Sequence, residues 1–78
     1  MPKGIHDERY RDLIQRLVAG RVASGVSQAV LANKLGKPQQ FVSRYEIGDR
    51  RLDAIEYVDV ARAIGLDPLQ ELASTIAG

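Results

Sequence analysis

The chain has 78 residues, 45% of them hydrophobic, with no cysteine and a formal net charge of +1. This length suits a single domain over residues 1–78 with a modest core, and the lack of cysteine excludes a disulfide framework and a thiolate metal site. No stretch is long and apolar enough for a signal peptide or a membrane span, so we expect a cytoplasmic protein that does not enter a membrane.

The first predicted helix covers residues 7–23. Its apolar side chains recur at helical spacing and form one broad stripe: Tyr10, Leu13, Ile14, Leu17, Val18 and Val22. Ser24 and Gly25 are expected to end this helix, because glycine readily takes the left-handed conformation found after a last turn. Ser27 is a suitable N-cap for the next helix.

Two short helical patterns then surround Gly36. The first has a stripe made of Leu31, Ala32 and Leu35, and the second has Val42 and Tyr45. Gly36 is expected to end the first helix, and Pro38 to restart the chain with its φ already fixed near the helical value. Helices this short, joined by so few residues, must cross steeply, which is the geometry of a helix-turn-helix.

The second of these helices leaves a polar face outside the predicted core. Its side chains offer hydrogen-bond donors and acceptors without a carboxylate, and we assign them to reading DNA bases: Gln39, Gln40, Ser43 and Arg44. A glutamine amide can pair with adenine, and a guanidinium with guanine. Phe41 lies beside this face and could either touch a thymine methyl or sugar, or cover the helix junction. Tyr45 is expected in the core.

Positive charge gathers around this motif. Residues 34–51 carry a net charge of +3, whereas residues 52–78 carry −4. This charge, which includes Lys37, Arg50 and Arg51, suits a face turned to DNA phosphates, and such contacts contribute affinity rather than sequence choice. On charge alone, two solvated surfaces of opposite sign remain an equally good interpretation.

Two more helices complete the pattern. Asp53 and Glu56 form a capping-box variant before a helix with Ile55, Val58, Ala61 and Ile64 on its inner side. Asp67 and Pro68 open a last helix with Leu69, Leu72, Ala73 and Ile76 on one side. Because no window shows sustained two-residue alternation, we predict an all-α fold of five helices.

From about Arg16 to Pro68 the sequence resembles the Cro and phage-repressor helix-turn-helix family, also called the XRE family. The matching elements are Arg21, Gly25-Val26-Ser27-Gln28, Leu31-Ala32, Leu35-Gly36, Val42-Ser43-Arg44, Glu46, Gly48 and Ala61-x-x-Ile64-Gly65. The resemblance implies a five-helix repressor-like domain, a homodimer on operator DNA, and regulation of transcription. We expect a repressor that inserts the helix starting near Pro38 into the major groove.

Family roles transfer to several positions of this sequence. Arg21 and Glu46 stand where the family commonly has an ion pair between the first helix and the end of the recognition helix. Ser27 and Gln28 open the second helix, where free backbone N–H groups and the glutamine amide can hold a phosphate.

Catalysis is the weaker alternative. Asp7, Glu8 and Asp12 alternate with arginines, which is typical of solvated ion pairs. The single histidine, His6, has no second metal-binding side chain at a suitable spacing. No phosphate-binding glycine loop occurs, so we expect no enzyme activity, metal, cofactor or small-molecule ligand.

Protein binding is the more serious alternative. An antitoxin or adaptor could use the same fold, with the acidic last third holding another protein. For self-association, the last helix offers Leu69, Leu72 and Ile76, and the first offers Tyr10, Leu13 and Ile14. We nevertheless expect Leu69 and Leu72 to fill the monomer core.

Overall fold

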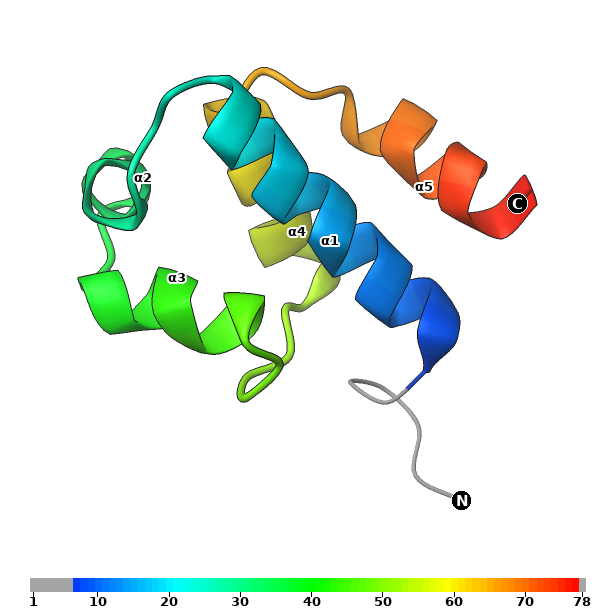
Figure 1. Cartoon of the computed structure of the whole chain (residues 1–78), viewed down its shortest axis with the longest axis horizontal. Coiled ribbons are helices and arrows are strands. Elements are labelled where there is room, and N and C mark those ends of the chain that lie inside the picture. The colour runs from blue at the N-terminus through cyan, green and yellow to red at the C-terminus, as the bar shows by residue number, and fades with distance from the viewer. Residues whose placement is uncertain (1–6, 78) are drawn as a thin grey trace.

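The computed structural model describes residues 7–77, and these form five α-helices without a strand, as predicted. The helices are α1 (Glu8–Ala23), α2 (Gln28–Leu35), α3 (Gln39–Glu46), α4 (Ala54–Ala63) and α5 (Pro68–Ala77). Figure 1 shows α1 crossing the middle of the molecule, with α4 behind it. The helices α2 and α3 lie on one side of α1, and α5 lies on the other.

Side chains cap the helices where the sequence predicted. The Ser27 hydroxyl accepts a hydrogen bond from the backbone N–H of Val30 at 3.1 Å, at the start of α2. Asp53 and Glu56 make both hydrogen bonds of a capping box at the start of α4. These bonds satisfy N–H groups that have no partner within a helix, so each helix begins at a defined residue.

The corner between α2 and α3 is built on Gly36. This glycine has φ 68° and ψ 32°, and the N–H of Lys37 donates to the carbonyl of Ala32 at 2.9 Å. Figure 1 shows α2 nearly end-on beside α3, so the two helices cross steeply, as expected. The tight corner brings the start of α3 directly against the end of α2.

Pro38 lies directly before the first helical residue of α3, with φ −69° close to the helical value, as expected. It is the N-cap of α3, with ψ 156°, because the chain still has to change direction after Gly36 before a helix can begin. Proline has no side-chain acceptor, and α3 accordingly lacks the side-chain hydrogen bond that Ser27 provides for α2.

The core is one cluster shared by the first four helices. Its fully buried large members are Leu17, Leu31, Val42, Tyr45 and Val60. Ala32 on α2 is also buried in this cluster, where a larger side chain would have to displace its neighbours. Gly20 has a similar role in α1, because a Cβ there would lie 2.8 Å from Cδ1 of Leu66, in the linker after α4.

One apolar side chain of α1 and one of α4 that periodicity placed in the core are exposed instead. Val22 lies eight residues after Ile14, a separation that rotates it by about 80° around the helix axis and away from the core. Ile55 is exposed because α4 turns a different stripe inward. That stripe is Tyr57, Val60, Ala61 and Ile64, of which the sequence analysis identified only the last two.

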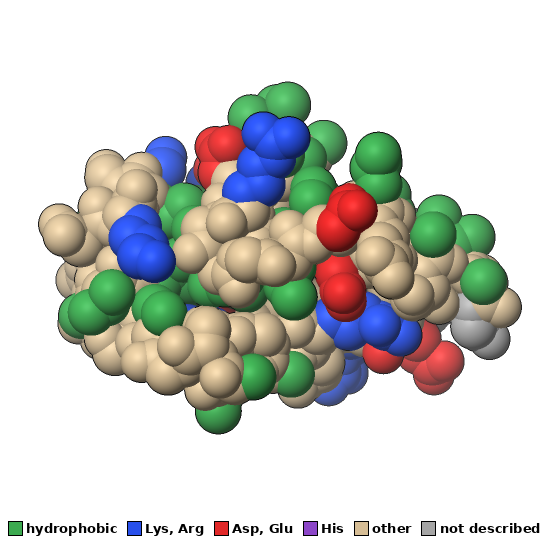
Figure 2. Space-filling model, turned by 90° about the horizontal axis from the view of Figure 1, so that it is seen from above, with side chains coloured by type: hydrophobic (Ala, Val, Ile, Leu, Met, Phe, Trp, Pro, Cys, Tyr) green, Lys and Arg blue, Asp and Glu red, His purple; other side chains and the backbone are tan. Residues whose placement is uncertain are grey.

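The last helix contributes little to the core. Leu69 is 77% exposed and Leu72 36% exposed, so the expectation that both fill the monomer core is wrong. Thr75 is the one buried residue of α5. Figure 2 shows hydrophobic side chains standing out at the end of the molecule where α5 lies. The helix contacts α1 and α4, leaves Leu69 largely in solvent and covers Leu72 only in part.

Within residues 7–77, no helix is long and apolar enough to cross a membrane. The same residues contain no group of three histidine, cysteine or acidic side chains placed to hold a metal ion. His6, the one histidine considered as a metal ligand, lies outside the described residues.

Candidate nucleic-acid interface

The outer face of α3 carries the residues assigned to base reading. Gln39 and Gln40 are exposed, the Arg44 side chain is 62% exposed, and Ser43 is half-buried. Residues spaced in this way lie on one side of a helix. The opposite side of α3 is buried through Phe41, Val42 and Tyr45, so the core fixes which face of α3 points outward.

Arg44 is only loosely engaged within the protein. Its Nε lies 3.9 Å from Oδ2 of Asp49, and both side chains are more than half exposed. An ion pair of this length in water contributes little to stability. The guanidinium is therefore available to an external hydrogen-bond acceptor.

Arg21 and Glu46 form the predicted ion pair. Nε and Nη2 of Arg21 donate to the two carboxylate oxygens of Glu46 at 2.7 and 3.0 Å, and both side chains are mostly buried. A third Arg21 nitrogen, Nη1, donates to the carbonyl of Val26 at 2.9 Å. The pair ties the end of α1 to the end of α3, and the bonds to Glu46 raise the pKa of Arg21.

Gln28 joins this pair, which the sequence analysis did not foresee. Its Nε2 donates to Oε1 of Glu46 at 2.9 Å. The side-chain amide of Gln28 is thus engaged inside the protein. Of the two kinds of donor predicted to hold a phosphate, the backbone N–H groups at the start of α2 remain. Ser27 lies beside them, with its hydroxyl engaged in the α2 cap.

A second polar cluster lies at the corner of α3 and α4. We call Lys37, Phe41, Arg50 and Glu56 the Phe41 cluster. Nζ of Lys37 lies 5.2 Å from the centroid of the Phe41 ring, and Cζ of Arg50 lies 4.8 Å from it. Of the two interpretations left open for Phe41, the structure supports a cover over the helix junction, because the residue is only 8% exposed.

Glu56 anchors Arg50 in this cluster. Its carboxylate accepts from Nη1 and Nη2 of Arg50 at 3.0 and 2.9 Å, and from the backbone N–H of Asp53 at 3.0 Å. These hydrogen bonds lower the pKa of Glu56 to about 2. The carboxylate is therefore ionised at neutral pH, and Arg50 keeps its counter-charge.

Arg51, the other loop arginine, points in a different direction. It is exposed, and its Cζ lies 5.2 Å from the centroid of the Tyr10 ring on α1. The Tyr10 hydroxyl accepts a hydrogen bond from the N–H of Leu52 at 2.9 Å. The loop that carries the two arginines is thus attached to α1 on one side and to α4 on the other.

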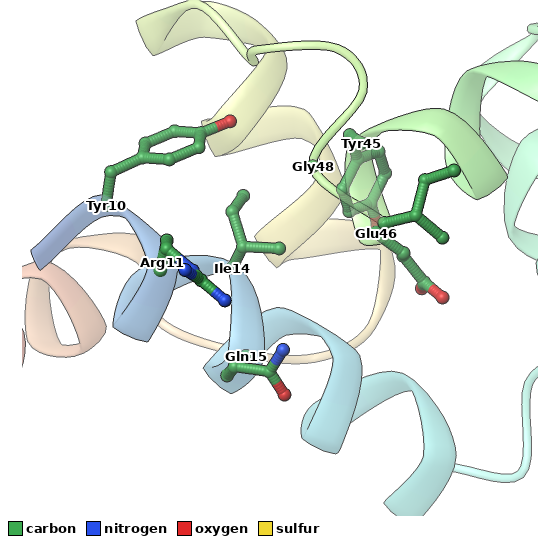
Figure 3. Close-up of a pocket in the computed structure, with 8 residues that line it drawn as sticks. Tyr10, Arg11, Ile14, Gln15, Tyr45, Glu46 and Gly48 are labelled. Atoms are coloured by element: carbon green, nitrogen blue, oxygen red, sulfur yellow. The ribbon is translucent and has the colours of Figure 1, made fainter. Parts of the chain in front are cut away.

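A pocket of about 280 Å³ lies between α1 and the end of α3. Figure 3 shows Tyr10, Arg11, Ile14 and Gln15 on one side and Tyr45, Glu46 and Gly48 on the other. The Tyr45 hydroxyl is buried without a hydrogen-bond partner among residues 7–77, and burial raises its pKa. With a single unsatisfied buried group, this pocket is a weaker candidate site than the outer face of α3.

The comparisons with known proteins agree with this geometry. A family model described as helix-turn-helix matches residues 17–70. The solved structure of an XRE-family like protein from Pseudomonas syringae pv. tomato str. DC3000 is 46% identical, with a TM-score of 0.89, over 94% of this chain and 89% of that chain. This chain belongs to the XRE helix-turn-helix family. No curated protein matches it significantly.

Membership of the XRE family identifies the roles of α2 and α3. The helices α2 and α3 are the helix-turn-helix itself, and α3 is in the place of the recognition helix. The family fold is a regulatory DNA-binding one, which agrees with the uncharged and basic side chains on the outer face of α3.

Proposed function

We propose that this XRE-family protein binds a specific operator in double-stranded DNA and represses transcription from it. The outer face of α3 carries the argument, because it presents amide, hydroxyl and guanidinium groups outward and contains no carboxylate. In this proposal α3 enters the major groove, where base pairs differ in their donors and acceptors.

Base reading is assigned to four residues of α3: Gln39, Gln40, Ser43 and Arg44. Two glutamine amides favour adenines, and one guanidinium favours a guanine, so the half-site should contain both kinds of base. The loose contact of Arg44 with Asp49 supports this role, since little interaction would be lost when the arginine turns to DNA.

Phosphate binding is assigned to residues around α3. Lys37, Arg50 and Arg51 supply positive charge, and Ser27 and Gln28 lie at the first turn of α2, where the Ser27 hydroxyl engages the backbone N–H of Val30 and the earlier N–H groups can serve a phosphate. Contacts of this kind fix the register of the protein on DNA but carry no sequence information. They should make the affinity strongly dependent on salt.

A homodimer is proposed because one short recognition helix reads only a few base pairs. The exposed residues Leu69, Leu72 and Ile76 of α5 support an interface there. The alternative face on α1 is weaker, since Leu13 and Ile14 are buried in the monomer. Two copies related by a two-fold axis would read half-sites about 10 base pairs apart.

Selection of bound duplexes from a random DNA pool tests the proposal. On the selected site, Arg44→Ala should cost about 1–3 kcal/mol of binding free energy and relax the preference mainly at one base pair. Arg62→Ala, which removes the same charge from an exposed position on α4, is the matched control and should leave that preference unchanged. Equal weakening on all sequences would make Arg44 a phosphate contact.

The antitoxin or adaptor alternative rests on the same exposed face of α5, which could hold another protein. It predicts that no duplex is bound in a salt-dependent manner. A flat response to salt across all duplexes would therefore favour the adaptor and refute operator binding.

A further inference from the structure

The Phe41 cluster joins charges from separate segments of the chain at one aromatic ring. Lys37 comes from the turn before α3, Arg50 from the loop after it, and Glu56 from α4. The ring itself is held firmly, because it packs edge-on against Tyr45 with 5.8 Å between ring centroids and an interplanar angle of 68°. Tyr45 is completely buried, so the ring has a fixed support.

We propose that Phe41 is a positioning residue, which holds Lys37 and Arg50 as a preformed pair of phosphate-binding cations beside the recognition helix. This inference rests on the DNA binding proposed above. The face of an aromatic ring attracts a cation, and one rigid ring can restrain two long side chains that would otherwise repel each other and sample many conformations. Restraint before binding lowers the entropy lost when a phosphate is bound.

Glu56 completes the arrangement by orienting Arg50. It binds Nη1 and Nη2 in a two-pronged contact and is itself held by the N–H of Asp53. In residues 7–77 the Nε–H of Arg50 has no hydrogen-bond acceptor, which leaves a donor for a phosphate oxygen. Within the cluster, Arg50 is paired with Glu56, and Asp59 lines the same pocket as Lys37 and Phe41.

This role differs from a base contact by Phe41. A ring that touched a thymine methyl would change which sequences are bound. A ring that positions phosphate-binding cations would change affinity for every sequence alike, because phosphates are the same throughout the duplex. The 8% exposure of Phe41 leaves little ring surface for a base and agrees with the second role.

The salt dependence of DNA affinity provides the test. Each phosphate contact contributes roughly 0.9 to the slope of log affinity against log salt. Phe41→Leu changes no charge, yet it should lower this slope by about one to two and weaken selected and scrambled duplexes by the same factor, several-fold at physiological salt. Lys37→Gln should lower the slope by about one.

Ile64→Ala is the matched control for a loss of stability. Ile64 is as buried as Phe41 but lies beside Gly20 and Leu66, away from the cations, so its substitution should leave the slope unchanged. In a double-mutant cycle on DNA affinity, Lys37→Gln should have a smaller effect once Phe41 is leucine. This cycle compares folded proteins at equal active concentration.

Three results would overturn the inference. The first is a salt slope for Phe41→Leu equal to that of the wild type. The second is a loss of DNA affinity confined to duplexes with particular bases. The third is an additive double-mutant cycle between Phe41→Leu and Lys37→Gln. If the wild-type protein itself shows no salt-dependent binding to any duplex, the proposed function fails instead, and the two failures are thereby distinguished.

Discussion

The helices α3 and α5 are both short and amphipathic, but they expose opposite faces. α3 buries Phe41, Val42 and Tyr45 and turns its polar face outward, whereas α5 buries Thr75 and leaves Leu69 77% exposed. Neighbouring helices cause the difference, since α2 and α1 cover the apolar side of α3. An amphipathic pattern alone therefore does not show which face of a helix is available to a partner.

The attachments of the two helices differ in the same way. α3 is held by its buried side chains and by the Arg21–Glu46 pair. α5 is held at its edges by polar contacts, from the Tyr57 hydroxyl to the carbonyl of Pro68 at 2.6 Å and from the Thr75 hydroxyl to Asp12 at 3.2 Å. This comparison predicts that substitutions in the contacts of α3 change the folding free energy. Substitutions on the exposed face of α5 should instead change the binding of a partner.

We expect the largest loss of folding free energy from removing the ion pair that secures α3. Glu46→Gln should cost about 3–5 kcal/mol of folding free energy, because it leaves Arg21 mostly buried without its counter-charge. Denaturant unfolding measures the loss. In a cycle with Arg21→Met the two substitutions should be strongly non-additive.

Glu71→Gln is the control for Glu46→Gln. It removes a carboxylate that lies 3.5 Å from Arg16, whose side chain is 36% exposed, and should cost less than about 1 kcal/mol. Similar costs at Glu46 and Glu71 would show that burial does not distinguish the two ion pairs.

The exposed face of α5 gives the next largest effect. Leu69→Ser should leave the folding free energy within about 0.5 kcal/mol. It should weaken self-association by about 1.5–3 kcal/mol for each leucine that the dimer buries. Sedimentation equilibrium with and without a palindromic site measures this, and Val30→Ser, at a half-exposed valine on α2, is the control. A strictly 1:1 complex at saturating protein would exclude the dimer.

The pH dependence of stability should reveal the contact between Arg50, in the loop after α3, and Glu56 in the first turn of α4. The pKa of Glu56 is lowered from 4.5 to about 2 in the folded protein. Its stabilising contribution is therefore complete above about pH 4.5 and lost as the pH falls through about 2. We expect about 1 kcal/mol after solvent screening, since Arg50 is 40% exposed. Arg50→Gln should remove the larger part of this pH dependence and leave the part that the N–H of Asp53 provides, and an unchanged profile would contradict the assignment.

The smallest expected effects on stability come from removing the hydroxyl groups of two tyrosines, one on α3 and one that contacts α5. Tyr45→Phe removes the buried hydroxyl without a partner on α3 and should stabilise the fold by up to about 1 kcal/mol. Tyr57→Phe removes the hydrogen bond to Pro68 at the start of α5 and should destabilise it by about 1 kcal/mol. Denaturant midpoints measure both. Destabilisation by Tyr45→Phe would mean that the hydroxyl binds an ordered water.

Local signals in the sequence were sufficient for most of the fold. Helix number, the αL glycine at position 36 and the capping box of Asp53 and Glu56 depend on neighbours within a few residues, and the structure confirms all three. The errors at Ile55 and Leu69 have another origin. A stripe of apolar residues shows that a helix has an inner side, but tertiary packing determines whether anything covers it.

The candidate site was predictable in part for the same reason. The exposed face of α3 followed from periodicity, and the Arg21–Glu46 pair followed from the resemblance to a known family. The contacts of Gln28 with Glu46 and of Arg50 with Glu56 and Phe41 were not predicted. Each depends on the angle at which two helices meet, and the sequence provides no direct measure of that angle.

The close approach of Leu66 to Gly20 has a consequence for how this sequence can diverge. Alanine in place of Gly20 would favour the helix by up to about 1 kcal/mol, but its Cβ would lie 2.8 Å from Cδ1 of Leu66. Because Cδ1 is the free end of a flexible side chain, alanine at position 20 requires the Leu66 side chain to take another rotamer. A smaller residue at position 66 removes this requirement, so Gly20→Ala should stabilise the protein more when position 66 carries a smaller side chain than leucine.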